Sequence, residues 1–248
     1  MNKRTRRLAL ASALAAAGIF AWTVYARYRQ PDLSSSRVVA ATAASSSAAA
    51  PAATEDQRAE FGRWFAAQPR VPINLSAGGA KVMILKFNDF QCPPCAQSHA
   101  AYMPIIKKIQ AEQPGSIRYV MVDYPLESEC NRYVALGPHP AACEAAAAVR
   151  LAWAHNRQDA MMDWLFANQA QLTPAIVRQA ARDVGQIDDF DAQYQATLEK
   201  IKGDVELGHF LDVRETPTFF VNGVKLEGKF AADYIEEAIE FELTSAPK

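Results

Sequence analysis

Two cysteines separated by two prolines constrain the fold of this chain more than any other feature. Residues 92–95 have the sequence CPPC, and they follow a short, mostly apolar run at Lys81–Phe87. From Cys92 to about Gln113 the apolar residues recur with the period of a helix, and a second strand is expected at Ile117–Asp123. Parallel pairing of the two strands requires a right-handed crossover. A dithiol at the junction of strand and helix in such a unit is typical of redox-active cysteine pairs.

The second half of the chain predicts helices and then a hairpin. From about 141 to 211 there are several helical patterns and no convincing strand. Thr218–Val221 and Val224–Leu226 then flank Asn222-Gly223, the strongest short hairpin signal, and a final helix is expected at about 231–243. We therefore expect an α/β fold with a βαβ half, a helical insertion at about 141–211, and a C-terminal β-hairpin-helix half.

The N-terminal 30 residues predict export. Leu8–Tyr25 contains 18 residues without a charge, with four basic residues before it and two after it. This pattern favours membrane insertion with the N-terminus inside, and export of the rest of the chain. We favour an uncleaved anchor in residues 1–30. A signal peptide cleaved after Ala26 is the main alternative, and a buried helix of the folded domain fits the flanking charges less well.

Residues 31–54 are dominated by Ser and Ala and contain too few large apolar groups to offset the entropy of ordering, so we expect a flexible linker. The folded domain is expected over 55–248. It should begin with a helix that carries Phe61, Trp64 and Phe65 on one side, followed by an extended piece at about Val71–Asn74.

The charge of the chain is unevenly distributed. Residues 1–30 hold six of the 26 basic residues and no acidic ones, which leaves 20 basic against 27 acidic residues in the rest. Nucleic acid demands a basic protein face, so an acidic body argues against a nucleic-acid partner.

The position of Cys92 at the start of a helix makes it the natural attacking sulfur. The helix dipole there favours the thiolate and lowers its pKa. Pro93 suits the first helical position, but Pro93 and Pro94 together remove two N–H donors and leave the N–H of Cys95 as the nearest one. We expect the pKa of Cys92 to be depressed but not extreme. Cys95, one turn inside, should be more buried and should resolve the mixed disulfide that Cys92 forms.

Other uses of a cysteine pair are a plain disulfide, half of a zinc site, or copper delivery. A zinc site would need a second ligand pair, but Cys130 and Cys143 are 12 residues apart and the four histidines show no paired spacing. We therefore expect no metal and no other cofactor. A copper-binding thiol chaperone stays open as an alternative from another functional class.

Cys130 and Cys143 bracket a stretch rich in turn residues, in a chain expected to fold where disulfides persist. The simplest interpretation is a structural disulfide, which for a loop of this length contributes about 3 kcal/mol. The alternative is a relay that exchanges electrons with Cys92.

Two motifs about 120 residues apart resemble the DsbA-like branch of the thioredoxin superfamily: residues 87–95 (FNDFQCPPC) and residues 216–223 (TPTFFVNG). Residues 124–126 (YPL) followed by Cys130, and residues 139–144 (HPAACE), are similar to the thioredoxin-like domains associated with vitamin K epoxide reductase homologues. The resemblance covers roughly residue 55 to the C-terminus.

The resemblance implies that Pro217 is a cis-proline facing the dithiol, and that Thr216 offers backbone groups to a bound substrate strand. A cis X-Pro bond usually serves a tight local geometry, and an exposed main-chain edge can bind an extended peptide whatever its side chains. An ordinary proline at the entry of a strand is the alternative for Pro217.

One position departs from the superfamily. Its members often carry a buried acid six residues before the first cysteine, where this chain has Lys86, so proton transfer to Cys95 lacks its usual partner. If Lys86 lies under the dithiol, its cation favours the thiolate and a more oxidising couple; alternatively, its ammonium reaches solvent. Asp89 is the other candidate for tuning the dithiol, unless it caps the helix.

We expect an extracytoplasmic thiol-disulfide oxidoreductase that introduces disulfides into exported proteins. Its substrates would be exported protein thiols or disulfides, and its redox partner a quinone-linked membrane protein that is DsbB-like or vitamin K epoxide reductase-like. The catalytic domain would be periplasmic or extracellular, anchored to the inner or cytoplasmic membrane, and monomeric. A disulfide reductase or isomerase on the same fold is the alternative.

Overall fold

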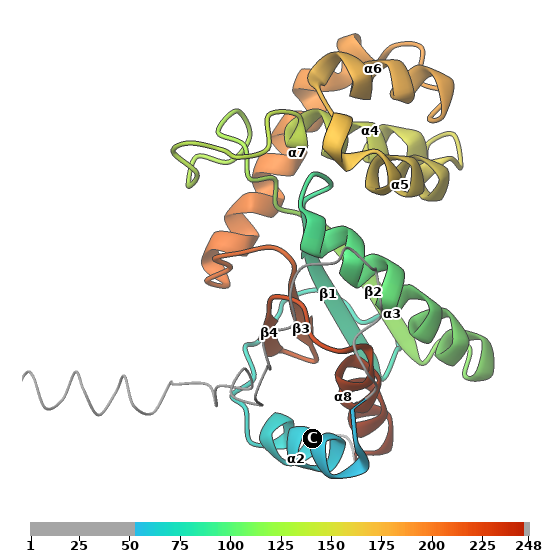
Figure 1. The fold of residues 1–248 in the computed structure, drawn as a ribbon, viewed down its shortest axis with the longest axis vertical. Coiled ribbons are helices and arrows are strands. Elements are labelled where there is room, and N and C mark those ends of the chain that lie inside the picture. Colours follow the sequence, from blue (N-terminus) through green and yellow to red (C-terminus); the bar gives the residue numbers. More distant parts are fainter. Residues whose placement is uncertain (1–52, 246–248) are drawn as a thin grey trace, which may run out of the picture. The chain divides into compact units, whose positions relative to one another are not determined.

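A computed structural model describes residues 53–245, which form a four-stranded sheet surrounded by helices (Figure 1). The strand order is β2-β1-β3-β4. The bounds of the strands are β1 Val82–Asn88, β2 Ile117–Asp123, β3 Thr218–Val221 and β4 Val224–Glu227. Every residue of β1 is buried, as expected of a mostly apolar central strand covered on both faces.

The parallel half of the sheet places the start of a helix at the carboxyl ends of two strands. β1 pairs in parallel with β2, from Val82 opposite Ile117 to Asn88 opposite Asp123. Helix α3 (Pro93–Glu112) connects the two strands, so its N-terminus lies just beyond the end of β1. The dithiol is thereby placed at the carboxyl edge of the sheet.

The antiparallel half is a tight hairpin. β3 pairs antiparallel with β1 and with β4, and Asn222 and Gly223 both adopt positive φ, as the two central residues of this turn require. A Cβ on Gly223 would lie 2.4 Å from the backbone oxygen of Val71, so a larger residue would not fit. The hairpin predicted from Asn-Gly is confirmed.

Helices cover both faces of the sheet. Alternate β1 residues, Val82 and Ile84, share a core with helices α2 (Glu55–Ala66), α3 and α8 (Ala232–Thr244). The intervening residues, Met83, Leu85 and Phe87, pack toward the C-terminal part of helix α7 (Phe190–Phe210). Side chains of a strand alternate between faces, so Lys86 falls on the same face as Ile84 and therefore on the α3 side.

A separate helical core follows β2. Helices α4 (Ala142–Trp153), α5 (Gln158–Ala167), α6 (Pro174–Asp183) and α7, with a 3-10 turn at Gln169–Gln171, gather beyond one end of the sheet (Figure 1). Alanines of α4 are buried in this core, which lets its neighbours approach closely. The predicted α/β fold with a helical insertion is confirmed.

Two expectations from the sequence have other outcomes. The extended piece expected at Val71–Asn74 forms no strand, and the chain makes only an isolated bridge between Arg70 and Val224. The anchor at 1–30, and the linker at 31–54 except its last two residues, lie outside the described residues. Of the helices within 53–245, none combines the length and the apolar character needed to cross a membrane.

Candidate active site

Cys92 is the N-terminal cap of helix α3, and Pro93 and Pro94 occupy the first two helical positions. The two prolines have no N–H, so the first amide of the helix that can face the cap sulfur belongs to Cys95. Cys92 is 4% exposed and Cys95 is fully buried, and both are free thiols in the structure. The sulfur of Cys92 is thus the more accessible of the two.

The loop before β3 lies against the dithiol. The Thr216-Pro217 peptide bond is cis, and the Cys92 thiol donates a hydrogen bond to the backbone oxygen of Thr216 at 3.1 Å. The pairing of Phe87 with Thr218 brings these segments together, because both then leave the sheet at the same edge. The Thr216 hydroxyl is buried and has no hydrogen-bond partner.

The two thiols differ strongly in acidity. A hydrogen bond from Cys95 is the main reason why the pKa of Cys92 falls to about 6; Thr216 and the Cys95 backbone act in the same direction, and burial opposes them. Burial raises the pKa of Cys95 well above its ordinary value, and the neighbouring Cys92 adds to this. At neutral pH the site therefore holds a thiolate on Cys92 and a thiol on Cys95.

Lys86 lies beneath the dithiol, and its side chain is buried. Its ammonium donates a hydrogen bond to the backbone oxygen of Cys95 at 3.0 Å and lies 5.5 Å and 5.8 Å from the ring centres of Phe166 and Phe219. Burial lowers the pKa of Lys86 to about 8, while Cys95 and Cys92 act to raise it. The alternative in which this ammonium reaches solvent is wrong, because Lys86 is 1% exposed.

Asp89 is fully buried and does not cap helix α3. One oxygen of its carboxylate accepts from the N–H of Gln91, and the other accepts from the N–H of Leu126, each at 2.7 Å. The second oxygen also lies 2.7 Å from Nδ1 of His139. The capping role considered for Asp89 is wrong, since the cap residue Cys92 follows it by three positions and makes no side-chain cap bond.

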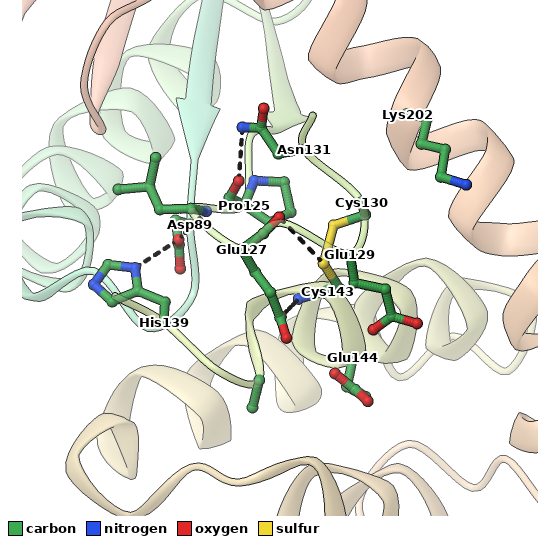
Figure 2. The surroundings of a disulfide bond; sticks show 12 residues. Asp89, Pro125, Glu127, Glu129, Cys130, Asn131, His139, Cys143, Glu144 and Lys202 are labelled. Atoms are coloured by element: carbon green, nitrogen blue, oxygen red, sulfur yellow. Dashed lines mark hydrogen bonds and ion pairs between the residues drawn. A yellow bond between two sulfur atoms is a disulfide. The ribbon is translucent and has the colours of Figure 1, made fainter. Parts of the chain in front are cut away.

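Cys130 and Cys143 are joined by a disulfide (Figure 2). The N–H of Cys143 donates to the carboxylate of Glu127 at 2.8 Å. Within residues 53–245, the only group of three potential metal ligands is Glu127, Glu129 and Cys143, and the sulfur of Cys143 is committed to the disulfide.

Three further residues contact the dithiol segment and were not singled out from the sequence. The side chain of Gln169 donates to the backbone oxygens of Phe90 and Cys92 at 2.8 Å and 2.9 Å, so the helical insertion borders the site. Gln91 accepts from the N–H of Ala141 at 2.6 Å. His139 stood only inside the HPAACE motif, and nothing in the sequence linked it to Asp89, which lies 50 residues away.

A dithiol that caps the first helix after the central strand, opposite a cis-proline loop, defines a thioredoxin-fold thiol-disulfide oxidoreductase. The sequence model of the family described as Thioredoxin matches residues 76–241, which is more than half of the chain. The chain belongs to the thioredoxin family, and its DsbA-like affinity within the superfamily is confirmed.

Three similar proteins illustrate this relationship. Disulfide bond formation protein D of Bacillus subtilis is 24% identical over 183 residues, which cover 68% of this chain and 76% of that protein. The Na(+)/H(+) antiporter NhaA 1 of Mycobacterium sp. (strain KMS) is 27% identical over 166 residues, or 65% of this chain. The chain spans only about a quarter of that antiporter's length.

The third is the crystal structure of Wolbachia pipientis alpha-DsbA1, which matches with a TM-score of 0.54 and 17% identity. It covers 68% of this chain and 92% of that chain, and it supports the fold. The narrower resemblance to domains associated with vitamin K epoxide reductase homologues stays a prediction.

Proposed function

We propose that this chain is an extracytoplasmic oxidase that introduces disulfides into exported proteins through Cys92 and Cys95. The observation that carries the proposal is the stabilised thiolate of Cys92, whose pKa lies at about 6. A dithiol whose reduced form is stabilised is a strong oxidant when it is in the disulfide form. The Cys130–Cys143 disulfide supports an oxidising compartment, since such bonds are rare in the cytosol.

The reaction starts from the oxidised Cys92–Cys95 pair. A substrate thiolate attacks the sulfur of Cys92, a mixed disulfide forms, and Cys95 leaves as a thiolate that takes up a proton. A second substrate thiolate then attacks the substrate sulfur of the mixed disulfide and expels Cys92. The substrate gains one disulfide and loses two electrons, which the Cys92/Cys95 dithiol now carries. The low pKa of Cys92 makes it a good leaving group in the second step.

Lys86 assists the first step in this proposal. Cys95 must leave as a thiolate from a fully buried position, and the nearby ammonium of Lys86 lowers the cost of that charge. The cation replaces the buried acid that is frequent at this position in the superfamily.

The loop at Thr216 and Pro217 would receive the substrate. Its backbone oxygen already accepts from Cys92, so a peptide whose sulfur replaces this contact would lie along the same main chain. Main-chain pairing of this kind binds an extended segment with little regard to its side chains, which suits an enzyme with many unfolded substrates.

The remaining parts of the proposal concern the setting of the enzyme. Residues 1–30 would anchor the chain in the inner or cytoplasmic membrane, residues 31–54 would act as a tether, and the domain at 55–248 would work as a monomer in the periplasm or outside the cell. A quinone-linked membrane protein would reoxidise the dithiol by accepting its two electrons. The name of the Bacillus relative, a disulfide bond formation protein, agrees with this direction.

The reduction potential of Cys92/Cys95 tests the direction of the reaction. The full chain is equilibrated with mixtures of reduced and oxidised glutathione, and a C130S/C143S variant serves as the control that isolates the dithiol. A value near about −120 mV is expected for an oxidase. A value near about −270 mV would instead identify a reductase.

A further inference from the structure

The loop closed by the Cys130–Cys143 disulfide lies against the segment that leads into the dithiol. His139 of this loop contacts the carboxylate of Asp89, and two residues later the N–H of Ala141 donates to Gln91. Asp89 and Gln91 both belong to the short connection between β1 and Cys92. Figure 2 shows His139 turned toward Asp89, with the disulfide beyond Glu127. A residue far along the chain is thus held next to the reacting cysteine.

The carboxylate of Asp89 works against the proposed chemistry. It is buried, it lies three residues before Cys92, and its negative charge acts to raise the pKa of the Cys92 thiol. Two backbone amides, those of Gln91 and Leu126, satisfy its oxygens but bring no full charge. The only cationic side chain in contact with it among residues 53–245 is that of His139 when protonated.

We propose that His139 is a positioning residue for the dithiol: its imidazolium, held by the disulfide-closed loop, neutralises Asp89 and so preserves the Cys92 thiolate. This inference rests on the proposed function, because it assumes that Cys92 is the reacting sulfur. His139 acts through Asp89 and does not touch the reacting atoms.

The charges around His139 favour its protonated form. The hydrogen bond to Asp89 is the main reason why its pKa lies above the ordinary 6.5; the charges of Asp89, Cys92 and Glu127 add to the shift, and partial burial opposes it. Glu127 itself has its pKa raised to about 7 by burial, so its help weakens in acid. The neutralisation of Asp89 is present at low pH and is lost as the pH rises through the folded-state pKa of His139.

The test is the pKa of Cys92 in the reduced full chain, measured from the pH dependence of its alkylation rate with the modified residue identified by mass spectrometry. His139→Asn keeps a donor near the position of Nδ1 but removes the charge, and it should raise the pKa of Cys92 by about one unit. His139→Lys keeps a charge and should restore most of the wild-type value. His155→Asn, at an exposed histidine, is the matched control and should change nothing.

The Asp89→Asn background separates charge from shape. Once the carboxylate is gone, adding His139→Asn should leave the pKa of Cys92 unchanged. The inference is overturned if His139→Asn does not raise the pKa in the wild-type background, or if it raises it equally with Asp89→Asn present.

A measurement without any mutation guards against variants that do not fold. By reciprocity, the Cys92 thiolate must raise the pKa of His139, so an NMR titration should give a higher value in the reduced protein than in the oxidised one. Equal values would refute the coupling. Failure of the proposed function looks different, because a chain without peptide-oxidising activity would still yield both titrations.

Discussion

Lys86 shows at the scale of one residue how the site trades stability for reactivity. Burial lowers its pKa to about 8, so the folded state holds this proton less tightly than the unfolded chain does. The charged lysine therefore destabilises the fold at neutral pH, while its ammonium makes the thiolate of Cys95 less costly.

Lys86→Met should reveal both sides of this trade. We expect the free energy of unfolding at pH 7 to rise by an amount on the order of 1–3 kcal/mol, because a buried charge is replaced by an apolar chain of similar length. The reduction potential should fall, because the reduced dithiol loses a nearby cation. Urea denaturation and glutathione equilibration measure the two quantities, and Lys108→Met at an exposed position of α3 is the control. An unchanged potential would remove Lys86 from the tuning of the dithiol.

The acidity of Cys92 can be measured independently through the pH dependence of the potential. Below pH 6 the reduced site carries two protons, so the potential should fall by about 59 mV for each pH unit. Above pH 6 Cys92 is a thiolate, only one proton accompanies two electrons, and the slope should halve to about 30 mV. Glutathione equilibria from pH 4.5 to 7.5 locate the break. A single slope across this range would contradict the low pKa.

The residues that the sequence predicted and those it missed differ in how they are brought together. Cys92, Cys95 and Lys86 are fixed by one strand and the helix that follows it, so their grouping follows from local periodicity and spacing. The contact of His139 with Asp89 depends on the path of a loop that spans 50 residues of sequence and is closed by a disulfide. No local pattern specifies such a path.

The disulfide loop is the element whose contribution to stability is most easily isolated. The cross-link joins residues 13 apart and removes freedom mainly from the unfolded chain. A C130S/C143S variant should lose about 3 kcal/mol of unfolding free energy by the chain-entropy model, seen as a lower urea midpoint. C130A/C143A is a matched second variant that avoids burying two hydroxyls. A loss below about 1 kcal/mol in both would point away from a structural role and toward the relay alternative.

The secondary structure was predictable because each element carries its own signals. Helix α3 begins at the prolines after Cys92, the hairpin turns at Asn222-Gly223, and β2 occupies the expected Ile117–Asp123. The piece at Val71–Asn74 is the exception. Its pairing depends on β4, more than 140 residues away, and only Arg70 forms a bridge to that strand. Extended segments whose partner is distant have no local signal that decides whether a ladder forms.

Across the folded domain, several buried carboxyl groups should set how stability varies with pH. Burial raises the pKa of Asp123 from 3.8 to about 6 and that of Glu127 from 4.5 to about 7, and the pKa of Asp204 is raised for the same reason. Within these intervals the folded protein binds more protons than the unfolded chain, so stability falls as the pH rises. The raised pKa of His139 has the same sign above 6.5.

The oxidised protein, in which no cysteine titrates, should therefore be more stable at pH 5 than at pH 7. Urea midpoints at closely spaced pH values measure this trend. Glu127→Gln can still accept from the N–H of Cys143 but cannot ionise, so it should flatten the part of the curve between about pH 4.5 and 7. Glu199→Gln, on the exposed face of α7, should leave the curve unchanged. A stability that rises over this range would mean that the buried carboxyl groups ionise more easily in the fold than in the unfolded chain, and that their partners outweigh burial.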